Sequence, residues 1–559
     1  MKPFSIERKI SSRISLLFAC ATATALLSSP SSAQVNTGLL IHSLPTLPQS
    51  KLKPDATAED VEIGNPKAAI TGVAAQYDSI RLTGFQSELA DDVEGYRFVS
   101  QYFPLQLTSQ DWERVSHDIF NNYTSRGKMV RVDLVMKEDK SAVVDISELR
   151  IHSIKLKNPG LRDEQVTDLN RLLREYVKEG EIIDLKKLKA FLSRIDYRGV
   201  ETVTTKFLAI TEDGVDLNIT VEPRQIAEFD PWSVTMDNYG SAGFGPARVT
   251  ASYSAPLFSP GDNLSVQTVI SQGLQNISGR YDFPFPAVLP LRGSLWASGL
   301  QYETSDADVE ERGHATLGGL DVNYPYFFWS GAKLVGGLGY ERKQSKDEVV
   351  ALDTTSKSIS NLHIRFNASD FYDKRLSFSG DFVSGNLGLN GALATLQDNL
   401  TAQTRGSFQK FVWKADFVQP ISTQSYLAAS GNGQWADKNL DSLEKMYFGG
   451  SSGVRAYNNS VSGDEGALFS LNYLYQLPNM DSPTHVGGLI DYAIGKTSRS
   501  PWTGESTQSN TFHLNAIGVQ ADTTFQKLTF NTSLSHPIRS SAEVPDQSWQ
   551  LWATLGFTF

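Results

Sequence analysis

The stretch 449-GGSSGVRAYNNS-460 combines flexible residues with one rigid cation. Glycine, serine and asparagine dominate it, yet Arg455 stands close to the apolar Val454 and Tyr457. A guanidinium presents its N–H donors in a fixed planar fork, which suits two-point pairing with a carboxylate. A surface loop has no need for that combination, so the role of Arg455 depends on the structure that surrounds the stretch.

The other reactive side chains give little support for enzyme chemistry. The eight histidines are scattered without an HExxH spacing, which argues against a metal centre. No GxSxG, Walker or GxGxxG motif stands in the strand–helix context that its chemistry requires. The acidic run 306-DADVEE-311 is typical of a solvated loop face. We therefore predict no catalytic residue, no metal and no cofactor, and a protein that is not an enzyme.

The amino terminus indicates export from the cytoplasm. A basic start, an apolar stretch over 14–27 and the small residues 31-SSA-33 predict a signal peptide over residues 1–33. Cys20 is the only cysteine and lies inside this segment, so the mature chain has none. Lipidation of Cys20 is a weaker alternative, because the bulky Phe18 precedes it and the apolar run before it is short.

The mature chain is acidic and contains no apolar run long enough for a spanning helix. Removing the signal peptide takes away four basic residues and one acidic residue, which leaves 47 basic and 61 acidic residues and a net charge of −14. The absence of a basic stripe argues against nucleic acid as a partner. A membrane β-barrel shows lipid only every second residue, so an ordinary mean hydropathy is compatible with one. The chain fits a bacterial periplasmic or outer-membrane protein.

Two modules of similar order follow a proline-punctuated segment, 34–72, which we expect to be a linker. The first module, 73–149, starts with a strand, continues with a helix that Thr108 begins in a capping-box spacing, and ends with two strands. The second, 150–223, repeats the order with two helices between its strands. The pattern predicts two βααββ units. The preceding segment carries one short apolar piece, 39-LLIHSL-44, which suggests a single helical turn.

Beyond residue 223 the helical spacing disappears and short segments of alternating apolar residues recur to the carboxyl terminus. We count about sixteen such segments, the even number typical of a bacterial single-chain barrel. The last one, 549–559, is apolar at every odd position over about 11 residues, the length of a tilted membrane strand. Residues 224–559 are therefore predicted to form a 16-stranded antiparallel transmembrane β-barrel.

The connections between these segments support a membrane barrel over a soluble sandwich. Short connections such as 477-LPNMDSP-483 alternate with long polar ones. The long connections are predicted at 341–360 and 496–510. Short periplasmic turns and longer extracellular loops are the asymmetry of outer-membrane barrels. A buried edge strand of a soluble sheet would alternate like 549–559, but it would not explain this asymmetry.

Two βααββ modules before a sixteen-stranded barrel resemble the two-partner secretion transporters, the haemolysin/adhesin secretion-activation family, whose modules are POTRA domains. That family carries a V-R-G-[YF] motif in its sixth extracellular loop. The stretch 454-VRAY-457 is similar to it, and the loop 435–466 lies between the predicted eleventh and twelfth strands. The stretch 236–266 also resembles the family's first strands. The likeness covers roughly residues 75–559.

The resemblance assigns roles to particular residues. In the family the arginine of the motif folds back into the lumen and pairs with an aspartate of a D-x-G pattern on the thirteenth strand, which corresponds to Asp491 here. Ala456 and Ala493 stand where the family has glycine, and each adds a methyl group at a place of close backbone approach or unusual dihedral angle. The aromatic carboxyl terminus, Phe557 and Phe559, is expected to act as an assembly signal.

The resemblance also implies a function. A family member is a translocation pore that binds a cognate large β-helical exoprotein through its amino-terminal secretion domain and exports it. We expect a monomer in outer-membrane lipid, inserted by the barrel-assembly machinery, with its POTRA domains in the periplasm. The piece 39–44 would then belong to the helix that plugs the resting pore in relatives.

Two other functions remain open at this point. A barrel-insertion factor of the same superfamily shares the loop motif but usually has more POTRA modules. A passive porin-like channel would have no reason to carry the βααββ modules. The cargo is equally open between a haemolysin, an adhesin, a contact-dependent toxin and a haem-acquisition protein.

Overall fold

The computed structural model describes residues 44–45, 62–64, 70–71 and 80–559, the last range with gaps at 104, 140, 162, 199–200, 212–213, 224–229, 241, 259–260, 286–289, 305–310, 328–332, 350–352, 372–374, 458–460, 479, 481, 503–509 and 541–547. The expected signal peptide lies outside the described residues, and only Leu44 of the expected plug piece is described. No helix in this part of the chain has both the length and the apolar character needed to cross a membrane.

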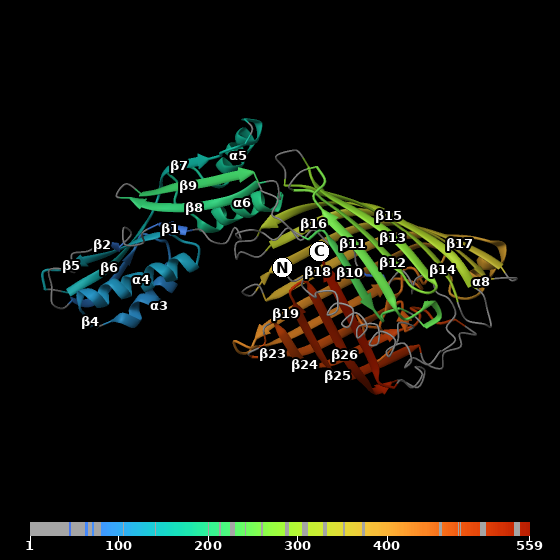
Figure 1. The fold of residues 1–559 in the computed structure, drawn as a ribbon. Helices are drawn as coiled ribbons and strands as arrows, with labels where there is room; N and C mark the ends of the chain where they lie inside the picture. The colour runs from blue at the N-terminus through green and yellow to red at the C-terminus, as the bar shows by residue number, and fades with distance from the viewer. Residues whose placement is uncertain are drawn as a thin grey trace, which may run out of the picture.

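The first module is a helix pair packed on a mixed sheet (Figure 1). Its elements are β3 (Ile80–Ser87), α3 (Val93–Val99), the short 3₁₀ turn Ser100–Tyr102, β4 (Gln106–Leu107), α4 (Ser109–Ser125), β5 (Val130–Met136) and β6 (Ser141–Glu148). The expected capping box is present, because the Thr108 side chain accepts from the Asp111 backbone and Asp111 accepts from the Thr108 backbone. Trp112, Ile119 and Tyr123 of α4 are buried against the sheet.

The second module repeats this order. Its elements are β7 (Ile151–Lys157), α5 (Asp163–Tyr176), α6 (Leu185–Arg198), β8 (Glu201–Thr211) and β9 (Gly214–Pro223). Leu188, Leu192 and Ile195 of α6 are fully buried beneath its sheet. The structure thus contains the two βααββ units that the sequence predicts.

Two short strands lie inside the segment 34–72, which was expected to be a linker. β1 (Glu62–Gly64) pairs in parallel with β8, and β2 (Ile70–Thr71) pairs in parallel with β5. The sheet orders are therefore β2-β5-β6-β3-β4 in the first module and β1-β8-β9-β7 in the second. Segments this short carry no readable periodicity, so alternation along the chain cannot reveal them.

Sixteen antiparallel strands close into a barrel in chain order, and β10 pairs with β27 to complete the ring (Figure 1). They are β10 (Trp232–Asp237), β11 (Arg248–Ala255), β12 (Asn263–Ile270), β13 (Leu274–Pro284), β14 (Arg292–Glu303), β15 (Glu311–Phe327), β16 (Lys333–Val349), β17 (Asp353–Asp370), β18 (Leu376–Asn390), β19 (Gly406–Pro420), β20 (Ser425–Ala436), β23 (Glu465–Gln476), β24 (Thr484–Lys496), β25 (Thr511–Phe525), β26 (Leu528–Ser540) and β27 (Gln550–Thr558). The predicted fold is confirmed. The helix α8 (Ala392–Leu400) and the turn Ala242–Phe244 lie between barrel strands.

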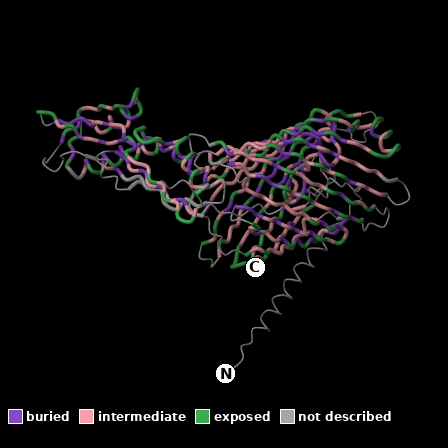
Figure 2. Tube along the Cα trace, turned by 90° about the horizontal axis from the view of Figure 1, so that it is seen from above, coloured by how far each residue is buried: buried purple, intermediate pink, exposed green. Residues whose placement is uncertain are grey.

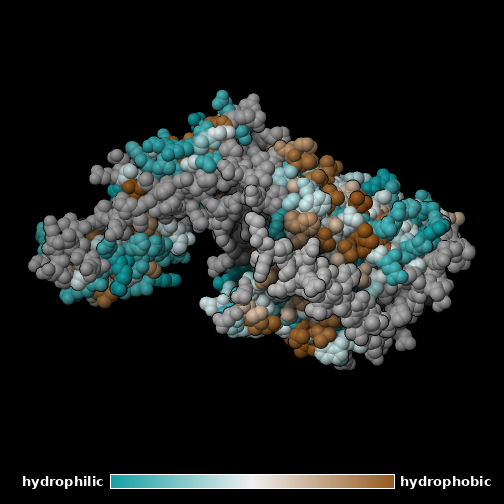
Figure 3. All heavy atoms as spheres, in the orientation of Figure 1, coloured by the Kyte–Doolittle hydropathy of each residue, from teal (hydrophilic) through white to brown (hydrophobic). Residues whose placement is uncertain are grey.

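Alternate residues of each barrel strand point outward, and β24 is an example. Ile490, Tyr492 and Ile494 are 51%, 38% and 37% exposed, whereas the intervening Asp491 and Ala493 are buried. The space-filling view shows apolar side chains gathered on the outer surface of the barrel, and the tube view shows buried stretches along its strands (Figures 2 and 3). The barrel thus has an apolar exterior and a polar interior, the arrangement of a membrane barrel.

The expectation of a long loop at 341–360 is wrong. β16 and β17 continue through it with an unbroken ladder, and only 350–352 lie between them. A β-ladder is held by backbone hydrogen bonds and tolerates polar side chains, so the two strands extend past the 9–11 residues, roughly, that cross the lipid. The polar side chains begin where the two strands leave the lipid, and the strands themselves continue beyond that point.

The second module touches the barrel at the end where β14 begins. The Arg194 guanidinium of α6 donates to the hydroxyl of Tyr324 on β15. Arg292 of β14 donates to the Tyr197 carbonyl at 3.5 Å, and the ammonium of Lys333 lies 5.1 Å from the centre of the Tyr197 ring. We call this the module end of the barrel and the opposite rim the far end.

Candidate functional site

The loop 437–464 connects β20 to β23 and folds back into the barrel. It contains the two-residue strands β21 (Met446–Tyr447) and β22 (Ser462–Gly463), which pair with one another. Its tip is compact, because the Val454 amide donates to the Phe448 carbonyl at 2.7 Å and the Gly450 amide to the Tyr457 carbonyl at 2.8 Å. A Cβ at Gly453 would lie 2.4 Å from the carbonyl oxygens of both Phe448 and Gly449. Gly453 therefore has a steric cause, and Gly450 has a φ of 93°, which side chains disfavour.

Arg455 pairs with Asp491 on the inner wall of β24. Its Nε lies 2.9 Å from Asp491 Oδ2 and its Nη2 lies 2.7 Å from Oδ1, which is a two-point fork. The Arg455 backbone N–H also donates to Oδ2 at 3.1 Å. The side chain of Asp491 is fully buried and that of Arg455 is 12% exposed. Two charges at this depth are stable only with close pairing and further hydrogen bonds.

Neutral side chains complete the coordination of this pair. Arg455 Nη1 donates to Gln520 Oε1 at 2.9 Å, and Nη2 donates to Ser470 Oγ at 2.9 Å and to Asn472 Oδ1 at 2.8 Å. The Ser470 hydroxyl in turn donates to Asp491 Oδ1 at 2.7 Å. β23, β24 and β25 each supply partners, so the fork is held from three adjacent strands. We call Arg455, Asp491 and these three neutral partners the tip anchor.

The last strand also reaches the loop. Trp552 of β27 turns inward, and its Nε1–H donates to the Arg455 carbonyl at 2.7 Å. Its ring makes an edge contact with Tyr239. The outward residues Phe557 and Phe559 of the same strand region are 42% and 47% exposed, with rings stacked 5.6 Å apart. The strand that joins the chain's end to β10 therefore also supports the tip of the loop.

The apolar residues of the motif and the two alanines pack together. Val454, Ala456 and Tyr457 are fully buried, and they share one cluster with Ala493 and Phe448. Ala456 is not among the described non-glycine residues with positive φ, which are Asp91, Gln403 and Gln526. The extra methyl groups thus fill an apolar contact, and neither alanine requires a dihedral angle reserved for glycine.

A second charged contact holds the first limb of the loop, and sequence reasoning missed it. Glu444 is 1% exposed and lies 3.0 Å from Lys343 Nζ of β16 and 2.8 Å from Lys410 Nζ of β19. Lys343 also pairs with Glu341 at 3.1 Å, and Asn361 donates to Glu444 Oε1 at 3.0 Å. We call these five residues the limb anchor. Charges alternate through it, so each buried ammonium or carboxylate has an opposite neighbour.

Two further ion pairs flank the limb anchor. Lys357 of β17 lies 2.9 Å from Asp441, and Lys445 lies 3.0 Å from Asp464 within the loop itself. The loop is therefore bound to the β16–β19 wall at its start and to the β23–β25 wall at its tip. It lies inside the barrel from one wall to the other.

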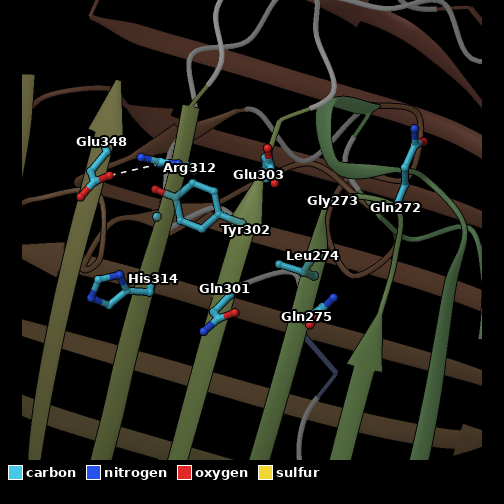
Figure 4. A pocket seen from close by; sticks show the side chains of 11 residues that line it. Gln272, Gly273, Leu274, Gln275, Gln301, Tyr302, Glu303, Arg312, His314 and Glu348 are labelled. Carbon is cyan, nitrogen blue, oxygen red and sulfur yellow. Dashed lines mark hydrogen bonds and ion pairs between the residues drawn. The ribbon is translucent and has the colours of Figure 1, made fainter. Parts of the chain in front are cut away.

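A separate cavity of about 360 Å³ lies at the far end of β13–β16, away from this loop (Figure 4). Arg312 and Glu348 form an ion pair at 3.2 Å across it, and His314, Gln301 and Glu303 also line it. Across the described part of the chain, no group of three or more His, Cys, Asp or Glu side chains could hold a metal ion.

Comparison with known proteins decides the family. Residues 213–501 match the family model described as haemolysin secretion/activation protein ShlB/FhaC/HecB. The chain belongs to this family. It is a two-partner secretion transporter of the bacterial outer membrane, with its POTRA modules in the periplasm. The module end of the barrel is thus the periplasmic end and the far end is extracellular.

Similar full-length proteins agree with this assignment. The heme/hemopexin transporter protein HuxB of Haemophilus influenzae (strain 86-028NP) is 23% identical over 575 residues, with 98% of each chain covered. The outer membrane transporter CdiB of Dickeya dadantii (strain 3937) is 22% identical over 463 residues, covering 76% of this chain and 77% of its own. The solved structure of CdiB from Escherichia coli has a TM-score of 0.56 at 14% identity, covering 91% of this chain and 94% of its own, which shows the shared fold.

The transporter's limb anchor left only a weak trace in the sequence. Lys343, Lys357 and Lys410 are basic residues within barrel strands, and Asp441 and Glu444 follow β20. A lumen that carries isolated lysines needs carboxylates, and the loop is a source of them. Which carboxylate meets which lysine depends on the closed barrel and is not readable from spacing.

Proposed function

We propose that this transporter binds one cognate secreted protein through its two periplasmic modules and passes it through the barrel as an unfolded chain. The observation that carries the proposal is the arrangement of two strand-edged modules, here taken as residues 73–149 and 150–223, at the periplasmic mouth of a polar lumen. An open sheet edge can bind an extended chain by backbone hydrogen bonds. No catalytic step is required, since folding of the cargo outside the cell can draw the chain outward.

The loop would act as the fixed inner wall of the path. A loop of this length has a large conformational entropy, which two buried ionic contacts offset. We assign Arg455 and Asp491 the role of fixing the tip, with Val454, Ala456 and Tyr457 as its packing support. The contacts at 2.7 and 2.9 Å, with three neutral partners, support this role. The loop then divides the lumen and defines the space left for the cargo.

The remaining partners follow from the barrel itself. The outward apolar side chains meet outer-membrane lipid, and we propose that the chain works as a monomer because the ring closes on itself. Phe557 and Phe559 lie outward on the closing strand, where the barrel-assembly machinery could recognise them during insertion. Residues 224–559 would form the inserted unit.

The similarity to HuxB gives one indication of the cargo. HuxB is described as a heme/hemopexin transporter and matches this chain along 98% of its length. A haem-acquisition exoprotein is therefore the first cargo to test, ahead of a haemolysin, an adhesin or a contact-dependent toxin. A large repeat-rich exoprotein encoded beside the transporter gene is the natural candidate.

A gene deletion separates the possible functions. Deleting the transporter gene should abolish surface export of the neighbouring exoprotein while other outer-membrane barrels keep their normal abundance. A general loss of barrels would instead indicate a barrel-insertion factor. Unchanged export together with lower uptake of small solutes would indicate a porin and would contradict the proposal.

A further inference from the structure

The chain's own amino-terminal segment already occupies one edge of each module. β1 runs parallel to β8, with Glu62 opposite Phe207 and Gly64 opposite Ala209. β2 runs parallel to β5, with Ile70 opposite Val132 and Thr71 opposite Asp133. Both short strands are labelled in Figure 1.

The two occupied edges are topologically equivalent. β5 and β8 are each the first strand after the helix pair of their module, and each is antiparallel to the next strand, β6 or β9. Without β1 and β2, each would be the outermost strand of its sheet. An outermost strand presents a row of unpaired N–H and C=O groups that recruits another strand. The same edge is thus filled twice, and with the same parallel direction.

The two added strands share almost no sequence. β1 is 62-EIG-64 and β2 is 70-IT-71. Pairing of different residues with equivalent edges indicates recognition through the backbone, which a foreign extended chain can imitate. Such a site is a general strand acceptor and not a sequence-specific contact between fixed parts.

One side chain at the β5 edge, that of Asp133, offers an added strand a specific polar contact. Asp133 lies opposite Thr71, and its Oδ1 is buried without a hydrogen-bond partner among the described residues. Burial raises the pKa of the Asp133 carboxyl, and its cross-strand neighbour Asp145 adds to this rise while Arg131 opposes it. A strand with a basic side chain at this position, where the chain's own strand has Thr71, would satisfy the unpaired oxygen.

The same segment also reaches the barrel wall. Leu44 packs against a buried cluster that includes Leu274, Leu300 and Tyr302, and Gln267 of β12 donates to the Pro45 carbonyl at 3.3 Å. In chain order the described pieces therefore contact the barrel, then the second module, then the first. A cargo chain entering from the periplasm would meet the same surfaces in the reverse order.

We propose that the β5 and β8 edges are the sites where an extended segment of the cargo adds as a parallel strand, and that β2 and β1 fill these edges until the cargo displaces them. The inference rests on the proposed function, because it names the surface that the exported protein uses. An internal competitor raises the apparent dissociation constant of the cargo by the inverse of the fraction of time that the edge is free. If it fills the edge nine-tenths of the time, apparent affinity falls about tenfold.

A reversible cross-link tests the displacement. The mature chain has no cysteine, so the pair Gly64→Cys and Ala209→Cys is the only thiol pair present. These residues are opposite one another in register, and neighbouring strands lie about 4.8 Å apart, within the span of a disulfide. We expect the disulfide to form under oxidising conditions and to lower export of the cognate exoprotein at least tenfold. Adding a reductant should restore export.

The matched control is the pair Lys155→Cys and Asn218→Cys. It joins β7 to β9, another parallel pair of the same sheet, and no displacement is proposed there. Its oxidised form should export normally. Normal export by the oxidised 64–209 pair would overturn the inference, and so would failure of that disulfide to form while the control disulfide forms. If the unmodified chain exports no exoprotein at all, the proposed function fails and not this inference.

A second variant should strengthen cargo binding, whereas a damaged module would weaken it. Ile63→Pro removes a backbone N–H and disfavours strand pairing, so it should empty the β8 edge. The purified full chain should then bind a purified amino-terminal fragment of the cognate exoprotein several-fold more tightly. Weaker or unchanged binding would contradict the competition. A misfolded module cannot produce the predicted gain.

Discussion

The two anchors of the lumen loop solve the same problem with different chemistry. The tip anchor joins one guanidinium to one carboxylate and completes the shell with Ser470, Asn472 and Gln520. The limb anchor joins compact ammonium groups to two carboxylates in an alternating row. The first depends on the direction of the donors and the second on the balance of charge.

This difference follows from the walls that the anchors meet. The β23–β25 wall presents neutral polar groups and one aspartate, so a residue with several fixed donors can satisfy them all. The β16–β19 wall presents two lysines at Glu444, and a single carboxylate with two oxygens can accept from both. The tip anchor should therefore be intolerant of changes in shape, and the limb anchor of changes in charge. Four substitutions test this contrast, in order of expected effect.

Arg455→Ala should have the largest effect. It leaves Asp491 buried without its cation, and breaking one side of a buried pair costs roughly 3–5 kcal/mol. Export of the cognate exoprotein should fall at least tenfold, while barrel abundance in the outer membrane stays close to normal. Immunoblots of medium and membrane fractions measure both quantities. Normal export would remove the role assigned to the tip anchor.

Glu444→Gln should free the first limb while leaving the tip in place. It removes the charge that Lys343 and Lys410 share, so Lys343 keeps only Glu341 and Lys410 loses the carboxylate it pairs with. On intact cells, trypsin should cut at Lys438 or Lys445 in this variant and not in the parent. Glu444→Asp, which keeps the charge, is the control. Cleavage after Arg455 as well would mean that the two anchors are not independent.

Arg455→Lys separates shape from charge at the tip. Lysine keeps the cation but cannot reproduce the fork and the three neutral contacts at once. Export should fall about three- to tenfold, less than in Arg455→Ala. The matched change at the limb, Lys410→Arg, keeps the charge and should export more protein than Arg455→Lys. Equal export by the two variants would contradict the contrast between shape and charge.

Trp552→Phe should have the smallest effect. It keeps an aromatic ring beside Tyr239 but removes the N–H that bonds to the Arg455 carbonyl. A buried carbonyl without its donor costs roughly 1–3 kcal/mol. The unfolding temperature of the purified barrel, followed by its gel mobility, should fall by a few degrees with export reduced no more than about twofold. A loss as large as that of Arg455→Ala would show that the Trp552 hydrogen bond is as important for the tip as the Arg455 side chain.

Much of the fold was predictable before the structure, together with one contact of the loop, the pair Arg455–Asp491. Alternation identified the barrel and its strand number. The resemblance to the family, and not the spacing, assigned Asp491 on the thirteenth strand as the partner of Arg455, and the structure pairs the two. The error at 341–360 arose because side-chain polarity reports the position of lipid and not the end of a backbone ladder. Trp552 was visible only as a polar-face exception in the last strand, and its partner was not visible.

By itself, the sequence determined the properties that depend on near neighbours. Export, the βααββ order, the two faces of each strand and the rigid cation in a glycine-rich turn all follow from local composition and periodicity. Tertiary structure decided the pairings between distant residues, such as Glu444 with Lys343 and β1 with β8. The reason is geometric. Ring closure decides which walls face the loop, and sheet order decides which strand edges stay open. Neither produces a repeating residue pattern within one segment of the chain, so neither can be predicted from local sequence.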